Sequence, residues 1–90
     1  MNWNTSIKGF NSYLLLEKHL SQNSIEAYIR DVKQLCSYSE KYHKLVSPVK
    51  INQSILVEFI AFLYSSKINE RSQARIISGI KSFFKYLIIE

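Results

Sequence analysis

The sequence predicts an all-α fold: one compact domain over residues 1–90, built as a bundle of four helices. Four segments repeat apolar residues every three or four positions, the spacing that gathers them on one side of an α-helix. The 90 residues include two glycines and one proline, too few for a turn-rich β-sandwich. An apolar content of 47% excludes a disordered chain, and a chain of this length builds one modest core.

The first helix is expected over about Thr5 to Leu20. Ile7, Phe10 and Leu14 recur there at helical spacing and form its inward side. His19 is expected at the C-terminal end of this helix, where a solvated imidazole interacts favourably with the helix dipole.

The second helix is expected over about Ser24 to Tyr42. Two N-caps are possible: Asn23, with Glu26 three residues later as a capping box, or Ser21. Cys36 lies on the apolar stripe and is expected in the core; as the single cysteine it makes no internal disulfide. The whole stripe comprises Ile25, Tyr28, Ile29, Val32, Leu35 and Cys36.

Residues 43–52 form the longest connection, and their role stays open. Pro48 disfavours helical geometry at Ser47, so no helix continues through this segment. The third helix is expected over Gln53 to Ser66, with Asn52 as its N-cap. Its inward side comprises Leu56, Phe59, Ile60 and Leu63.

The last helix is expected over Arg71 to Ile88, capped by Asn69 or Ser72. Its apolar stripe comprises Ile76, Ile77, Ile80, Phe83, Phe84 and Leu87. The opposite side carries Arg71, Arg75, Ser78, Ser82 and Lys85, and Lys81 borders it. One side of this helix therefore belongs to the core, and the other is a basic surface.

The positive charge of the chain is concentrated in this last helix. Residues 71–89 hold four cations and no acid, whereas residues 1–70 hold eight cations and six acids, within a net charge of +5. Lys81 and Lys85 suit an ordinary solvated C-terminal end. Arg71 and Arg75 lie in the first turns, where the helix dipole disfavours cations, and an anion bound at that end reverses the penalty. This placement indicates a phosphate-binding helix start.

An offset of 48 residues aligns the second helix with the fourth. Leu20, Ser24, Tyr28 and Val32 match Ile68, Ser72, Ile76 and Ile80. Chance similarity of two amphipathic helices is one interpretation. The other is that the two helices present equivalent N-terminal ends to one ligand.

Catalytic chemistry has little support in the residues. His19, His43 and Cys36 lack the spacing of metal ligands, and the usual phosphate-loop and hydrolase motifs do not occur. No metal and no cofactor are therefore expected. The spacing places Tyr28, Phe59, Phe83 and Phe84 in the core, whereas Tyr38, Tyr64 and Tyr86 are expected to be less buried.

Two segments, LSQNSIEAYIRDVKQL (Leu20–Leu35) and INERSQARIISGIKSFFKYLI (Ile68–Ile88), carry a family resemblance. In order and spacing they resemble the N-terminal core-binding domain of tyrosine recombinases, a SAM-like integrase domain. The similarity is closest to the bacterial Xer type and extends from about Asn4 to Glu90.

The resemblance implies a compact four-helix SAM-like bundle that binds one face of double-stranded DNA, with the second and fourth helices at the major groove. Hydroxyl and backbone N–H groups then meet phosphates, and arginines meet phosphates or guanine edges. The implied DNA-binding residues are Ser21, Asn23, Ser24, Arg30, Arg71, Ser72, Arg75, Ser78, Lys81, Ser82 and Lys85.

The catalytic residues of that family, which include an HxxR motif and a nucleophilic Tyr, lie C-terminal to this domain. None of the six tyrosines matches the nucleophile, so the fragment is expected to bind DNA, to cleave nothing and to be monomeric. In the parent protein, other recombinase protomers are expected partners in a tetrameric synapse. Chromosome dimer resolution and mobile-element integration both stay open. No run of ~20 apolar residues spans a membrane, so a cytoplasmic location is expected.

Two other classes of function stand as alternatives. A helical protein–protein interaction module would dock an acidic partner on the basic surface. A small enzyme would need an acid–base or nucleophile constellation, which the sequence lacks.

Overall fold

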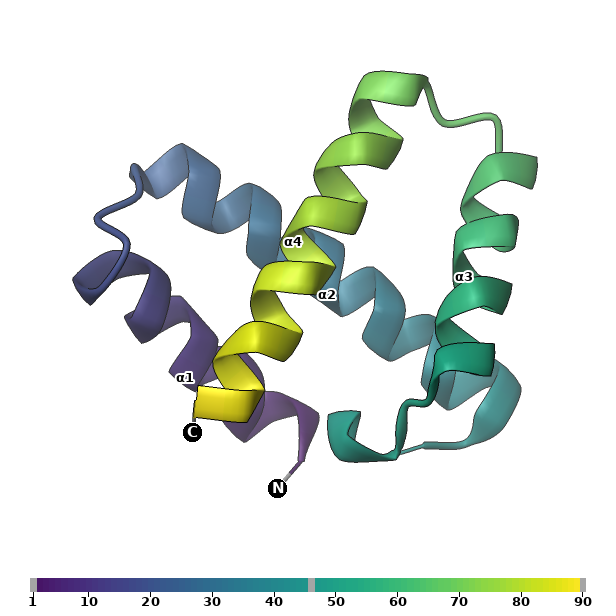
Figure 1. Ribbon diagram of the computed structural model, residues 1–90, viewed down its shortest axis with the longest axis horizontal. Helices are drawn as coiled ribbons and strands as arrows, with labels where there is room; N and C mark the ends of the chain where they lie inside the picture. Colours follow the sequence, from purple (N-terminus) through teal and green to yellow (C-terminus); the bar gives the residue numbers. More distant parts are fainter. Residues whose placement is uncertain (1, 46, 90) are drawn as a thin grey trace.

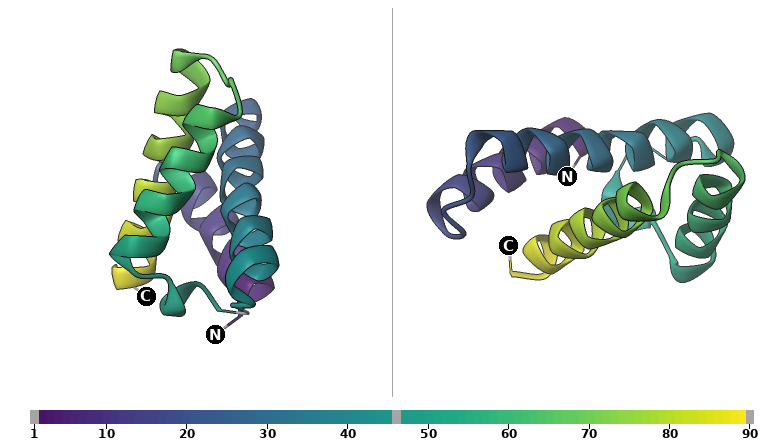
Figure 2. Two further views of the ribbon diagram at one scale, coloured as in Figure 1. Left: turned by 90° about the vertical axis from the view of Figure 1, so that its right-hand side faces the viewer. Right: turned by 90° about the horizontal axis from the view of Figure 1, so that it is seen from above.

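The computed structural model describes residues 2–45 and 47–89 and confirms the all-α bundle. Figure 1 shows α4 crossing in front of α2, with α1 on one side of the crossing and α3 on the other. Figure 2 shows α4 and α2 in separate layers, and α2 packs against all three other helices. The elements are α1 (Trp3–Leu16), α2 (Gln22–His43), a 3₁₀ turn η1 (Pro48–Lys50), α3 (Gln53–Ser65) and α4 (Glu70–Ile89).

α1 ends at Leu16, four residues before the predicted end at Leu20. The chain turns through His19, whose φ of 53° lies in the left-handed region, and the Leu20 N–H donates to the Leu14 carbonyl at 3.2 Å. This turn brings the Leu20 side chain against the core. His19 is therefore exposed beyond the helix rather than within its last turn.

The helix starts follow the predicted capping chemistry. Asn52 caps α3, since its Oδ1 accepts the Ile55 N–H at 2.9 Å. Of the two candidates for α2, Ser21 is the cap; Asn23 lies inside the helix, so the capping box with Glu26 is wrong. Capping satisfies a backbone N–H that the first helical turn leaves without a partner.

The connection between α2 and α3 is shaped by its proline. Ser47 is extended, with φ −140° and ψ 137°, as the following Pro48 predicts. Pro48 then starts η1 and is itself buried. Val46 lies outside the described residues.

Aromatic rings fill the centre of the core. Phe10, Phe59 and Phe83 are almost completely buried. The rings of Phe10 and Phe83 meet edge to face at 5.2 Å, and Trp3 stacks on Phe83 at 6.1 Å. These contacts hold α1 against α4.

Two of the three tyrosines expected near the surface are buried, so that part of the prediction is wrong. Tyr38 and Tyr86 are 8% and 7% exposed, whereas Tyr64 is 61% exposed as predicted. Tyr86 fits beside α1 because Gly9 lacks a side chain, and a Cβ at residue 9 would collide with the Tyr86 hydroxyl. Cys36 packs at the edge of the core rather than inside it.

Candidate nucleic-acid interface

One side of α4 presents cations and a hydroxyl group to solvent. We call this surface the α4 outer face; its exposed polar residues are Arg71, Ser78, Lys81 and Lys85, with Ser72 and Ser82 half-buried at its border. The spacing of three and four residues places these side chains on one side of the helix, as predicted. The arrangement is a basic strip along α4.

The start of α4 differs from the prediction by one acidic residue. The helix begins at Glu70, so its first turn contains a carboxylate, and the expectation of a last helix without acids is wrong. A carboxylate at this end is favourable to the helix dipole and offsets part of the unfavourable position of Arg71.

The starts of α2 and α4 have matching caps. The Ser21 Oγ accepts the Ser24 N–H at 3.2 Å, and the Asn69 Oδ1 accepts the Ser72 N–H at 2.8 Å. Both pairs obey the 48-residue offset found in the sequence. Both helices begin at the upper side of the molecule in Figure 1. The first turns of α2 keep Ser21, Asn23 and Ser24 exposed there.

Arg75 differs from the other cations because it has an anion within the protein. Its Nε donates to Asp31 Oδ2 at 3.1 Å, and its Nη2 donates to Asp31 Oδ1 at 2.9 Å. These hydrogen bonds raise the pKa of the Arg75 guanidinium. The sequence had suggested that Arg75 needs a bound external anion; the structure corrects this, since Asp31 compensates the charge. The Arg75 side chain remains 39% exposed.

The crossing of α2 and α4 is close at this ion pair because α4 has a glycine there. A Cβ at Gly79 would lie 3.3 Å from Tyr28 Cδ1 and 3.5 Å from Asp31 Oδ2. Asp31 is fully buried and would be costly as an isolated charge. The bidentate pairing with Arg75 satisfies both carboxylate oxygens.

Arg30 belongs to a different surface from the α4 outer face. It lines a groove of about 470 Å³ between α1 and α2, to which α4 contributes no lining residue. Lys8 and Lys33 add two cations to this groove, and Glu26 adds one acid. The sequence analysis missed Lys8 and Lys33, because only the packing of α1 on α2 brings them together with Arg30.

A polar cluster ties the C-terminal half of α2 to α3. The Tyr38 hydroxyl donates to Glu58 Oε2 at 2.5 Å, and His43 Nε2 lies 2.7 Å from the same oxygen. The hydrogen bond from Tyr38, followed by that from His43, lowers the pKa of Glu58. Burial and the nearby Glu58 raise the pKa of Tyr38 to about 12. The cluster fastens α3, which has few other polar contacts with α2.

Other site chemistry is lacking in the described part of the chain. Within residues 2–45 and 47–89, no group of three or more His, Cys, Asp or Glu side chains is arranged to hold a metal ion. Burial and a hydrogen bond to Glu40 raise the pKa of the Cys36 thiol to about 12, which disfavours the nucleophilic thiolate. None of the described helices has the length and apolar character needed to cross a membrane.

Comparison with known proteins identifies similar sequences. The profile of the family "Phage integrase, N-terminal SAM-like domain" matches residues 7–90. A tyrosine recombinase XerD of Listeria monocytogenes is 38% identical over 85 residues, covering 94% of this chain and 29% of the relative. XerD of Rickettsia conorii is 40% identical over 84 residues, covering 93% and 27%. XerC of Leptospira interrogans is 35% identical over 91 residues, covering 97% and 28%.

The chain thus spans less than a third of the length of these curated relatives. No solved structure matches it.

Proposed function

Because the chain belongs to the family of phage integrase N-terminal SAM-like domains, with Xer-type tyrosine recombinases as relatives, we propose that it binds double-stranded DNA. In these recombinases the domain is the N-terminal part, and the catalytic site lies in the C-terminal domain. The proposed role is to hold a specific duplex for recombination that a C-terminal domain catalyses, together with other recombinase protomers, in the bacterial cytoplasm. The domain by itself cleaves no DNA.

The observation that carries this proposal is the set of uncompensated cations on the α4 outer face. Among the described residues the ion pairs are Arg75 with Asp31 and His43 with Glu58, so Arg71, Lys81 and Lys85 have no carboxylate partner. Phosphate binding by such cations releases counterions and supplies most of the non-specific affinity for DNA. The strip along α4 therefore suits one strand of a duplex backbone.

The hydroxyl groups support the same proposal. Ser78 lies among the cations and Ser82 at their border, while Ser21, Asn23 and Ser24 are exposed at the start of α2. Short polar side chains of this kind donate hydrogen bonds to phosphate oxygens and fix the register of a protein on DNA. Ser72, at the start of α4, extends the surface toward its helix end.

Arg75 has two proposed roles. Its hydrogen bonds to Asp31 hold α4 on α2, and its exposed part remains available to a phosphate or a guanine edge. A rigid guanidinium is well suited to such a contact, because its orientation is set before DNA binds. Arg30 is proposed as a contact from the neighbouring surface of α2.

A salt titration tests DNA binding. If Arg71, Arg75, Lys81 and Lys85 each neutralise one phosphate, log K falls against log salt with a slope of about −3.6. Replacing Lys81 and Lys85 with Gln is expected to reduce the slope to about −1.8. The control is a Lys41→Gln, Lys50→Gln double variant, which removes the same charge from exposed positions outside α4. A salt-independent affinity, or no affinity at low salt, contradicts the proposal.

One observation favours a second candidate function, docking of an acidic protein segment. The α1–α2 groove combines the cations of Lys8, Arg30 and Lys33 with apolar groups from Ile7, Ile25 and Ile29. Such a surface fits an amphipathic helix that carries both leucines and carboxylates.

The discriminating probe is a synthetic amphipathic peptide of Leu and Glu, titrated beside the duplex. A Lys8→Gln, Lys33→Gln variant is expected to lose peptide binding and retain duplex binding if the groove docks protein. Equal loss of both ligands assigns the groove to DNA instead.

A further inference from the structure

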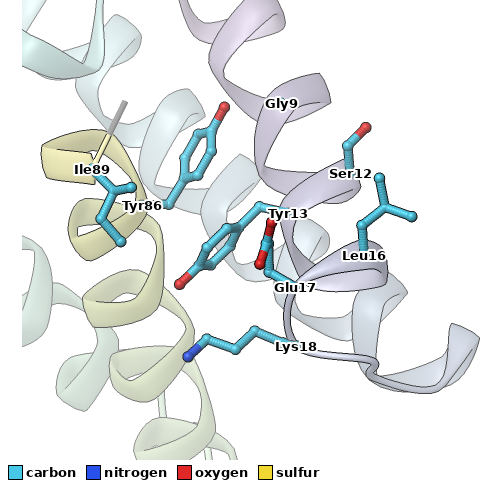
Figure 3. A pocket seen from close by; sticks show the side chains of 8 residues that line it. All are labelled: Gly9, Ser12, Tyr13, Leu16, Glu17, Lys18, Tyr86 and Ile89. Carbon is cyan, nitrogen blue, oxygen red and sulfur yellow. The ribbon is translucent and has the colours of Figure 1, made fainter.

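The largest hollow of the domain is a groove between α1 and α4, far from the α1–α2 groove. Figure 3 shows it as a cleft between the C-terminal halves of the two helices. Its volume is about 590 Å³, and its main lining residues are Gly9, Tyr13, Leu16, Lys18, Tyr86 and Ile89. We call it the α1–α4 groove.

The floor of this groove is built and its rim is unusually apolar. The rings of Tyr13 and Tyr86 lie 5.2 Å apart, and the ammonium group of Lys18 lies 5.8 Å from the centre of the Tyr13 ring. At the rim, Leu16 and Ile89 are 67% and 61% exposed. Large aliphatic side chains on both walls of one open groove are the mark of a surface that another chain segment covers.

The course of the chain indicates which segment this is. α4 runs toward the groove, and Ile89, its last residue, lines the rim. The matched family is an N-terminal domain, and the Listeria relative is so much longer that the matched region covers 29% of it. In a protein of that length, the residues after position 90 leave α4 directly beside the groove.

We propose that the segment following residue 90 in the full-length protein turns back and occupies the α1–α4 groove. Apolar side chains of that segment cover Leu16 and Ile89, and the tyrosine floor receives them. A tethered segment has a much higher effective concentration at the groove than a second copy or a free peptide. The proposed segment thereby fixes the direction in which the rest of the protein leaves this domain. The inference does not depend on DNA binding.

The chain offers matched controls for a labelling experiment. Leu15 and Leu16 are neighbours in α1 and both are exposed, at 52% and 67%, but only Leu16 lines the groove. Single Leu15→Cys and Leu16→Cys variants of the full-length protein are prepared in a Cys36→Ser background. Their rates of thiol alkylation are measured by mass spectrometry of the labelled peptide and divided by the rates in urea.

If the segment covers the groove, Leu16→Cys reacts at least tenfold more slowly than Leu15→Cys, although Leu16 is the more exposed residue here. Reaction at Leu16→Cys as fast as at Leu15→Cys overturns the proposal. A photo-crosslinking residue in place of Leu16 then identifies the occupant. Crosslinks within one chain to the residues after position 90 support the proposal, whereas crosslinks between two chains overturn it. DNA binding enters neither measurement, so its failure would leave this result unaffected.

Discussion

Arg75 of α4 holds the carboxylate of Asp31 in α2 through two hydrogen bonds of 3.1 and 2.9 Å, across a separation of 44 residues. Asp31 is completely buried, whereas the Arg75 side chain keeps 39% of its surface exposed. The pair therefore links the two helices proposed to contact DNA. It also makes the two partners unequal, because only one of them retains access to water.

This inequality predicts unequal costs of removal. Arg75→Met leaves a buried carboxylate without a partner and is expected to lower the free energy of unfolding by about 3–5 kcal/mol. Asp31→Asn leaves a half-exposed guanidinium that water can solvate, and a cost of about 1–2 kcal/mol is expected. Urea unfolding followed by circular dichroism measures both variants. Equal costs would show that the burial of Asp31 does not govern the energetics.

Arg71 allows DNA binding to be separated from stability. It is exposed on the α4 outer face and has no carboxylate partner among the described ion pairs. Arg71→Ala is therefore expected to weaken duplex binding about tenfold, roughly 1.4 kcal/mol for one charge-assisted contact.

Two companion measurements belong to the Arg71 variant. The salt slope is expected to fall in magnitude by about 0.9, as for one lost phosphate contact. The urea midpoint is expected to stay unchanged. A loss of stability in Arg71→Ala would instead indicate a structural role for this arginine.

The two glycines predict opposite responses to alanine. A Cβ at Gly9 collides with the Tyr86 hydroxyl, so Gly9→Ala is expected to cost about 1–3 kcal/mol of overpacking. A Cβ at Gly79 meets Tyr28 Cδ1 at 3.3 Å, and Tyr28 is half-buried and can shift. Gly79→Ala gains up to ~1 kcal/mol of helix propensity, and a nearly neutral result is expected.

A double variant checks the collision at Gly9. Gly9→Ala combined with Tyr86→Phe removes the hydroxyl that the new methyl group meets. The double variant is expected to be more stable than the sum of the two single effects. Strict additivity in thermal unfolding would contradict a direct contact.

The Glu58 cluster predicts a pH dependence of stability. Hydrogen bonds from Tyr38 and His43 lower the pKa of Glu58 in the folded state below its ordinary value of 4.5. Its contribution is therefore present above about pH 4.5 and is lost as the pH falls through the folded pKa. Urea midpoints between pH 3 and 7 are expected to show a weaker acid-induced loss in Glu58→Gln. An unchanged acid limb would contradict the role of this carboxylate.

Local features of the sequence account for the helices and for the basic strip. The apolar residues of each segment recur with helical spacing, Asn52 and Ser21 have side chains that accept backbone N–H groups, and Pro48 blocks a continuous helix. Each of these effects acts over a few residues and can be read from neighbours alone. Residues of the α4 outer face share one side of a helix for the same reason, whatever the rest of the chain does.

Contacts between distant segments were beyond such reading. The partner of Arg75, the burial of Tyr86 against Gly9 and the separation of Arg30 from α4 all depend on how helices cross. The sequence determined four helices and where their charges lie along each one, because backbone hydrogen bonding and helical period are local. Only the tertiary structure decided which charges stay exposed, because α2 and α4 meet through Asp31 and Gly79, and that meeting converts one of four cations into an internal tie.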